Sequence, residues 1–211
     1  ALVPEDPRWQ RFAESAVDSL LSANPLHLGT WRQALEPVRL ALLPPLERAF
    51  RSRPDRGRLA AALLADYASD RPGILVNLLL DADESQFAML WPRVQCLGDE
   101  TLPVLHRELD LLPPPESKPG ERDRAARRQA QAAVALLRLG DDRRTWPLLR
   151  NSPDPSCRSY LLHFLGRFGA RSEPLIQRLR QESDPSIRQA LILALGEYNS
   201  KEVSPEARQG V

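Results

Sequence analysis

The most constraining feature of the sequence is a repeat of 30 residues near its C-terminal end. The segment Asp154-Pro155-Ser156 returns as Asp184-Pro185-Ser186. The same shift pairs Arg158 with Arg188, Leu161 with Leu191, Leu162 with Ile192, Leu165 with Leu195 and Gly166 with Gly196. Repeats with a period of about 20–50 residues are typical of stacked supersecondary units. The repeat therefore predicts a fold in which each unit packs on its neighbours.

Each copy has the features of a helix start. In the second copy we expect Asp184 to accept hydrogen bonds from the first turn and Pro185 to occupy the first helical position. Apolar residues then recur at steps of three and four, which predicts one buried stripe made of Ile187, Ala190, Leu191, Ala194 and Leu195. The first copy continues through a turn at Gly169 into a second helix at Pro174. The unit is a helix hairpin of about 30 residues, and its apolar stripe needs a neighbouring hairpin.

A proline followed by apolar residues extends this pattern towards the N-terminus. It marks the expected start of each second helix at Pro45, Pro72, Pro103, Pro147 and Pro174, at intervals of 27, 31, 44 and 27 residues. The long interval contains LLPPPESKPG, a proline-rich insertion of ten residues at 111–120, and 34 residues are left without it. We expect Trp146, which precedes one of these prolines, to pack against the preceding hairpin.

The sequence therefore predicts an all-α fold, a right-handed α-solenoid of antiparallel helix hairpins, or α-α superhelix. We divide it into an N-terminal capping helix at 1–22, divergent helical repeats at 23–110, the insertion at 111–120, better-defined repeats at 121–198 and a tail or linker at 199–211. The other expected helices are Leu28–Leu42 with a break at Pro37, one beginning at Pro44 and running through Arg53, Arg58–Ala68, Glu84–Leu97 and Glu121–Leu139.

Composition and charge exclude several classes of protein. The net charge is +1, with −4 in residues 1–120 and +5 in residues 121–211, so neither part demands nucleic acid or an anionic membrane. No run of 18 apolar residues and no signal peptide occurs. Cys96 and Cys157 lie in helical patterns without a CxxC pair, which predicts buried free thiols in a reducing cytoplasm. The chain begins without Met, and we expect it to be part of a longer protein.

The sequence offers no visible centre for catalysis. His27, His106 and His163 are far apart and form no HExxH motif, and His163 lies among apolar residues, which predicts a packing role. No phosphate-binding glycine loop and no GxSxG motif occurs. We therefore expect a non-enzymatic protein with no cofactor and no metal site. The tryptophans are expected to anchor the core, at Trp9, Trp31, Trp91 and Trp146.

The expected binding surface is the concave side of the solenoid, which second helices usually line. Arginines on these helices predict recognition of carboxylates on a protein partner, or of phosphates, through the planar guanidinium. A solvated helix face is the alternative interpretation. The candidate binding residues are Arg48, Arg51, Arg107, Arg150, Arg178 and Arg180, and Arg53, Asn77 and Gln177 lie on the same expected helices. The identity of the partner and the oligomeric state stay open.

The segment DPSIRQALILALG, residues 184–196, resembles the HEAT repeat in the short bacterial form also found in phycobilisome lyases. Good matches cover about residues 121–197, with Tyr160 where the pattern prefers a small residue. The whole chain is also similar to segments that link a protein kinase to a sulfatase-modifying-type domain in large bacterial proteins. The resemblance implies a cytoplasmic protein–protein interaction scaffold within a multidomain protein. The alternative is a HEAT-like DNA-binding protein or an alkylated-base DNA glycosylase.

Overall fold

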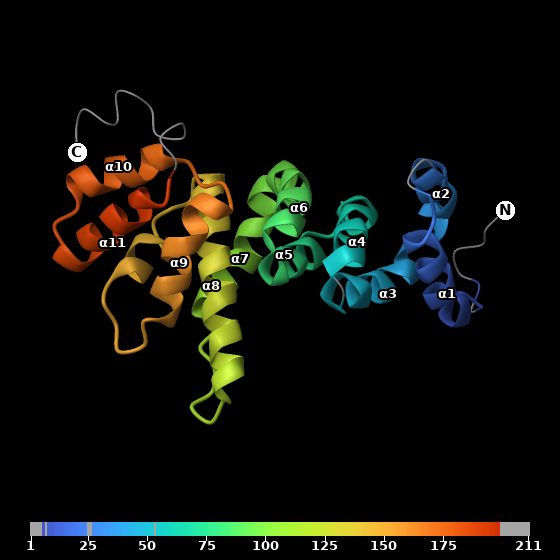
Figure 1. Ribbon diagram of the computed structural model, residues 1–211, viewed down its shortest axis with the longest axis horizontal. Coiled ribbons are helices and arrows are strands. Elements are labelled where there is room, and N and C mark those ends of the chain that lie inside the picture. Colours follow the sequence, from blue (N-terminus) through green and yellow to red (C-terminus); the bar gives the residue numbers. More distant parts are fainter. Residues whose placement is uncertain (1–5, 7, 25–26, 53, 199–211) are drawn as a thin grey trace. The chain divides into compact units, whose positions relative to one another are not determined.

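The computed structural model describes residues 6, 8–24, 27–52 and 54–198 (Figure 1). These residues form helices and connecting segments, and none of them lies in a β-strand. The chain divides into two compact units, unit 1 from Ala1 to Leu97 and unit 2 from Gly98 to Val211. The division lies ahead of the proline-rich segment at 111–120. The expected tail at 199–211 lies outside the described residues, as does Arg53.

Unit 1 is built from helices that pack on the next helix or the next but one along the chain. α3 packs against α1 and α4, and α6 packs against α4 and α5. The elements are α1 Trp9–Leu21, α2 Leu28–Leu35, the 3-10 helix η2 Glu36–Val38, α3 Arg39–Ser52, α4 Pro54–Tyr67, α5 Pro72–Asp81 and α6 Glu84–Leu97. The side chains between them are fully buried at Leu42, Leu46, Leu64, Leu75, Leu79 and Leu90. α1, α3, α4, α5 and α6 therefore cover one another's apolar side chains.

Unit 2 is built from helices that pack on their neighbours along the chain, with the long helix α8 beside α9 (Figure 1). Its elements are η3 Gly98–Thr101, α7 Leu102–Asp110, α8 Pro119–Leu139, η4 Trp146–Leu149, α9 Ser156–Arg167, α10 Ser172–Gln181 and α11 Pro185–Gly196. α9 packs between α8 and α11, while α7 contacts α8, η4 contacts α9 and α11, and α10 contacts α11. This stacking of helix pairs confirms the predicted all-α solenoid class.

α8 shows how composition determines close packing. Its apolar side is buried at Ala126, Ala130, Ala133, Val134 and Leu137. These small side chains let α7 and α9 approach the α8 backbone on both sides. The helix ends at Gly140, whose φ of 86° is the left-handed conformation that favours glycine at a helix C-terminus.

One predicted helix start is wrong. The break at Pro37 is confirmed, because α2 ends at Leu35 and the 3-10 helix η2 follows. However, no new helix begins at Pro44: α3 begins at Arg39 and runs through Pro44 and Pro45. Each proline removes a backbone hydrogen bond. The continuous helix is stabilised instead by burial of one stripe along its length, made of Leu42, Leu46 and Phe50.

The second helix predicted at Pro147 is reduced to the single 3-10 turn η4. The chain is extended directly after it, since Arg150 has φ −68° and ψ 149°. Trp146 and Leu149 of this turn are buried. These two side chains provide the core contacts that a second helix would otherwise make. The helix starts predicted at two other prolines agree better with the structure: Pro72 begins α5, and Pro103 lies in the first turn of α7.

Several expected core residues lie at the surface. Trp91 and Trp146 are buried as predicted, but Trp31 is 52% exposed because no described residue of α2 is buried, and Trp9 is only half-buried. The predicted burial of His163 is wrong, because it lies two residues after the buried Leu161, on the outer side of α9.

The two cysteines also differ from the prediction of buried thiols. Cys96 is exposed at the end of α6, two residues beyond the last buried side chain of that helix. Cys157 is half-buried, and desolvation raises the pKa of its thiol to about 11. Burial therefore holds the Cys157 thiol in its protonated, unreactive form.

Candidate functional site

A groove of about 380 Å³ opens in unit 2 between η4 and α10. The turn before η4 contributes Asp142 and Arg143, and η4 itself contributes Trp146. α10 contributes the side chains at one face, spaced three and four residues apart: Pro174, Gln177, Arg178 and Gln181. We call this hollow the η4–α10 groove. It exists because η4 is only one turn long and leaves space beside α10.

The floor of the groove is rigidly held. Trp146 and Ile187 line it and are both buried. Thr145, which precedes η4, is also buried, and its hydroxyl donates to the Ala133 carbonyl of α8 at 3.1 Å. The 3-10 turn is thereby tied to the central helix of unit 2. The groove keeps an apolar base under a polar rim.

The α10 wall of the groove contains a salt bridge that is part of the fold. Arg178 Nε donates to Glu182 Oε2 at 2.9 Å, and Glu182 is buried. The backbone N–H of Asp184 donates to Glu182 Oε1 at 2.9 Å, and this hydrogen bond, followed by that of Arg178, lowers the pKa of Glu182. Removing Arg178 would leave a buried carboxylate short of a partner. Arg178 therefore has a structural role.

Arg150 joins the groove to the start of α11. Its Nε donates to Asp184 Oδ2 at 2.8 Å. The pKa of Asp184 is lowered to about 2, first by the Ser186 hydroxyl and then by the Ser186 backbone N–H and Arg150. Arg143 is different, because it is exposed and no described residue forms an ion pair or hydrogen bond with it. Arg143 is thus the cation on the groove that is available to a ligand.

The predicted arginines separate into three situations. Arg150 and Arg178 line the η4–α10 groove. Arg180 lies on α10 outside the groove lining, and Arg107 is exposed on α7. Of the two in unit 1, Arg48 pairs with Glu14, and Arg51 pairs with Asp81 at 3.1 Å and with Glu47 at 3.3 Å. Arg143 was missed because it lies in a turn and not on a second helix.

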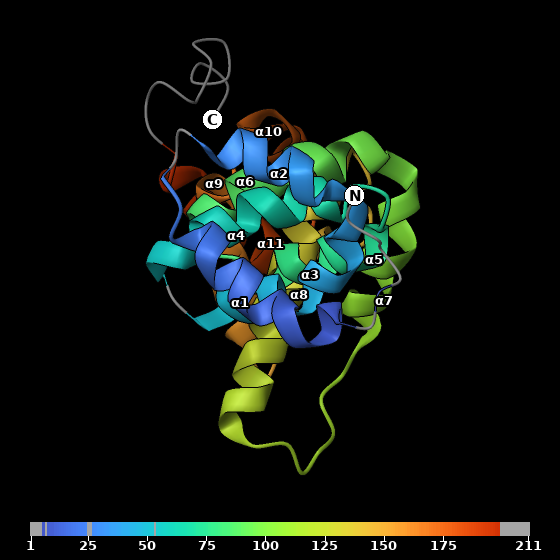
Figure 2. The ribbon, with the colours of Figure 1, turned by 90° about the vertical axis from the view of Figure 1, so that its right-hand side faces the viewer.

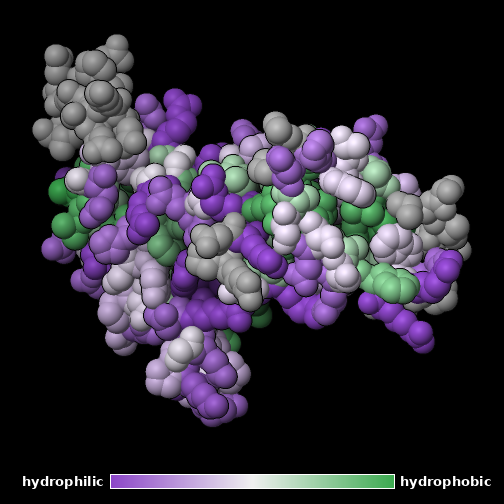
Figure 3. All heavy atoms as spheres, turned by 45° about the vertical axis from the view of Figure 1, so that its right-hand side comes forward, coloured by the Kyte–Doolittle hydropathy of each residue, from purple (hydrophilic) through white to green (hydrophobic). Residues whose placement is uncertain are grey.

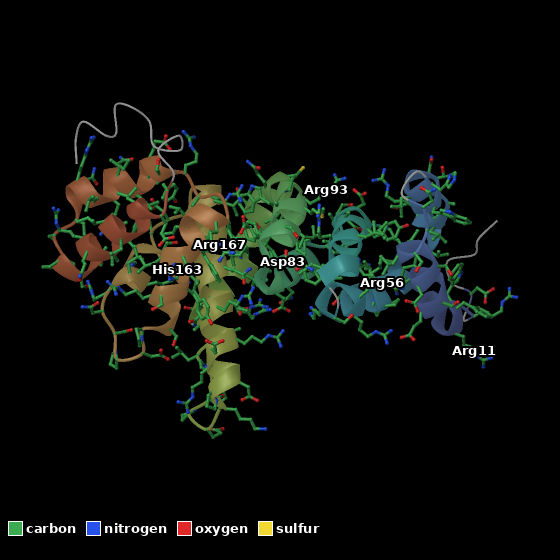
Figure 4. All side chains as sticks on the ribbon, viewed as in Figure 1. Arg11, Arg56, Asp83, Arg93, His163 and Arg167 are labelled. Carbon is green, nitrogen blue, oxygen red and sulfur yellow. The ribbon has the colours of Figure 1, made fainter. Side chains whose placement is uncertain are left out.

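A smaller hollow of about 240 Å³ lies in unit 1 and includes Arg48. Its cations are already paired: Arg48 with Glu14, and Arg56 with Asp18 at 2.9 Å (Arg56 is labelled in Figure 4). Ion pairs of this kind satisfy the cations internally. The hollow in unit 1 is therefore less suited to an anionic ligand than the η4–α10 groove.

Metal binding has no assembled centre in the part of the chain that the structure describes. No group of three His, Cys, Asp or Glu side chains there lies close enough to hold a metal ion. His106 Nε2 lies 2.7 Å from Asp141 Oδ2, and this pair joins α7 to the turn after α8. None of the described helices is both long and apolar enough to cross a membrane.

Residues 145–210 match the family model of HEAT repeats. The chain contains HEAT-like repeats. No curated protein and no solved structure matches it. HEAT repeats usually mediate protein–protein interaction and are generally non-enzymatic. Most of the η4–α10 groove lies within the matched residues, and Asp142 and Arg143 lie directly before them.

Proposed function

We propose that the HEAT-like repeats bind a protein partner without catalysing a reaction, and that the η4–α10 groove receives an extended, acidic segment of that partner. The observation that carries this proposal is the exposed, unpaired Arg143 beside a groove whose base is Trp146. An aromatic base with an arginine at the rim is the combination enriched in protein-binding hot spots.

The polar groups of the groove suit a peptide backbone and carboxylates. Gln177 and Gln181 are both exposed on the α10 wall, and their amides offer donors and acceptors to an extended main chain. Arg150 uses Nε for Asp184, and its guanidinium carries further donors. Arg143 is the point where an acidic side chain gains a charge-assisted hydrogen bond without breaking an internal pair.

Peptide selection tests this proposal with the whole chain as target. A random peptide library displayed on phage is selected on the wild-type chain, and enriched peptides are synthesised and titrated by calorimetry. We expect peptides rich in Asp and Glu, with affinity reduced about tenfold by Arg143→Glu. The melting temperature should be unchanged, since Arg143 has no partner among the described residues.

Arg180→Glu is the matched control, because it makes the same charge change on α10 outside the groove lining. Binding to this variant should stay within about twofold of wild type. Equal loss in both variants would move the binding surface to the wider arginine face that the sequence predicted. Peptides that bind the Arg143→Glu variant as tightly as wild type would refute the groove.

Duplex DNA is the counter-ligand, because the alternative function is DNA binding or base excision. The proposal expects weak DNA binding with a shallow dependence on salt, since most groove arginines are paired internally. A steep salt dependence, or release of an alkylated base, would favour the alternative. We also propose that these repeats are one part of a larger, cytoplasmic multidomain protein.

A further inference from the structure

The insertion between α7 and α8 forms an exposed, proline-rich tip that lies away from the groove. Residues 111–118 connect the two helices, and Leu112 within them is 83% exposed. Figures 1 and 2 both show this connection and the first turns of α8 projecting beyond the rest of unit 2, and the projection is also visible in Figure 3. The connection thus presents a large apolar side chain, that of Leu112, to solvent.

The three prolines of this tip determine its backbone conformation. Pro113, Pro114 and Pro115 each fix φ near −65°, and a residue before proline is held to extended ψ values. Leu111 already has φ −72° and ψ 105°, and no regular hydrogen-bonded structure is present until the turn at 115–116. The run from Leu112 to Pro114 is therefore restricted to extended backbone, the region that contains the polyproline II conformation.

Two hydrogen bonds from α8 hold the ends of this run. Gln129 Nε2 donates to the Leu111 carbonyl at 2.7 Å, and Arg122 Nη2 donates to the Pro115 carbonyl at 2.5 Å. Within the described residues, no group donates to the carbonyls of Leu112 and Pro113, which lie between these two points. The segment is therefore fixed at both ends and open in the middle, so little further ordering is needed when it binds.

We propose that the segment Leu112–Pro115 is a docking site for a protein domain with an aromatic-lined groove of the kind that binds polyproline II helices. Such grooves stack tryptophan and tyrosine side chains on proline rings and donate hydrogen bonds to the carbonyls between them. Leu112 supplies an adjacent apolar contact. No two of Pro113, Pro114, Pro115 and Pro119 are three residues apart, so domains that read consecutive prolines fit better than those that read a PxxP spacing.

Nuclear magnetic resonance titration of the whole 211-residue chain tests the site. The probes are a panel of isotope-labelled WW domains and labelled profilin, chosen for binding to consecutive prolines. We expect saturable chemical-shift changes confined to the aromatic groove of at least one probe. The dissociation constant should be roughly 10–500 μM, because the contact is made by a short segment. The double variant Pro113→Ala/Pro114→Ala should weaken this binding at least about tenfold, because it frees the backbone and removes two ring contacts.

Pro119→Ala is the matched control, since Pro119 begins α8 at the same tip but lies outside the extended run. Pro119→Ala should change the dissociation constant by less than about twofold. Leu112→Ser should weaken binding about fivefold, because the proposal includes an apolar contact with Leu112; a change below about twofold would show that the prolines alone are recognised. Arg143→Glu should have no effect, which separates this site from the η4–α10 groove. Absence of saturable shifts with every probe, or equal binding by the double-proline variant, would overturn the proposal.

Discussion

The two copies of the 30-residue repeat begin with the same three residues and yet start their helices differently. In the first copy α9 begins at Ser156, and the carboxylate of Asp154 accepts one backbone hydrogen bond, from Ser156 at 2.9 Å. In the second copy α11 begins one position earlier in the repeat, at Pro185, and Asp184 accepts from Ser186 at 2.9 Å and from Ile187 at 3.4 Å.

The difference arises from neighbours that only the second copy has. Asp184 also receives Arg150 from the segment after η4, and its backbone N–H is held by the buried Glu182. Asp154 follows a short segment without regular structure, and the Ser152 hydroxyl of that segment donates to the Asp154 carbonyl. The shared Asp-Pro-Ser sequence therefore predicts a helix start in each copy to within about one residue. Contacts from neighbouring residues then determine how many groups of the first turn are capped.

Both copies share a hydrogen bond from the repeated arginine to a backbone carbonyl. Arg158 Nε donates to the Leu149 carbonyl at 2.9 Å, and Arg188 Nη1 donates to the Leu179 carbonyl at 3.0 Å, nine residues earlier in each case. The repeated arginine thus satisfies a carbonyl at the end of the preceding second helix or its 3-10 equivalent. Its recurrence in the sequence reflects a contact inside the fold.

The largest expected effect compares the buried leucines at equivalent positions. Leu161 and Leu191 are both fully buried, and each contributes to the packing of α9 on α11. We expect Leu161→Ala and Leu191→Ala to lower the free energy of unfolding by about 3 kcal/mol each, because each leaves a cavity. Urea unfolding followed by circular dichroism measures both. A much smaller loss for Leu191→Ala would show that α11 unfolds separately from the rest of unit 2.

The next effect concerns the repeated arginine. Arg188 Nη1 donates to two carbonyls, those of Leu179 and Glu182, whereas a single carbonyl, that of Leu149, accepts from Arg158. We expect Arg188→Ala to cost about 2 kcal/mol and Arg158→Ala about 1 kcal/mol of unfolding free energy. The lysine variants are the controls, because lysine keeps the charge and loses the planar fork. Full rescue by lysine would show that charge alone matters.

A smaller effect should depend on pH and distinguish the two aspartates. The folded-state pKa of Asp184, about 2, lies below the ordinary value of 3.8, so the carboxylate stabilises the fold above about pH 4, and this stabilisation is lost as the pH falls towards 2. We expect Asp184→Asn to lower the melting temperature by about 2–4 °C at pH 7 and by less at pH 2. Asp154→Asn should have a smaller effect at pH 7, since Asp154 caps fewer groups. A pH-independent loss for Asp184→Asn would contradict this account.

Much of the fold could be predicted from local patterns. α6 has the predicted bounds of Glu84–Leu97, which follow from helical apolar spacing, and α8 covers the predicted Glu121–Leu139, which is rich in good helix formers and has no breaker. The path through Pro44 and the reduction of η4 to one turn could not be predicted in this way. Both depend on which apolar surface the neighbouring elements leave uncovered, and a local sequence pattern carries no information about that surface.

The candidate site shows the same limit. The pairing of Arg178 with Glu182 is visible in the sequence as a spacing of four residues at the end of a helix. The pairing of Arg150 with Asp184 joins residues 34 apart and needs the stacked repeat. Arg143 lies in a turn that the helix pattern did not consider. Arginines paired across the stacked repeats, such as Arg150, therefore could not be told from solvated ones by sequence.

The smallest expected effect tests whether the outer positions of the two copies are equivalent. His163 in α9 corresponds to Leu193 in α11 by the 30-residue shift, and the side chain of His163 is 63% exposed while Leu193 is 53% exposed. His163 Nδ1 lies 3.7 Å from Glu197 Oε1, and an exposed contact of this length contributes little. We expect His163→Leu, which copies the second repeat into the first, to change the free energy of unfolding by less than about 0.5 kcal/mol. Chemical unfolding at pH 7 and pH 5.5 measures this, with Leu193→His as the reciprocal control. A loss above about 1 kcal/mol in either variant would mean that the outer side of these helices is covered by another part of the protein, because only a buried position responds so strongly to the exchange.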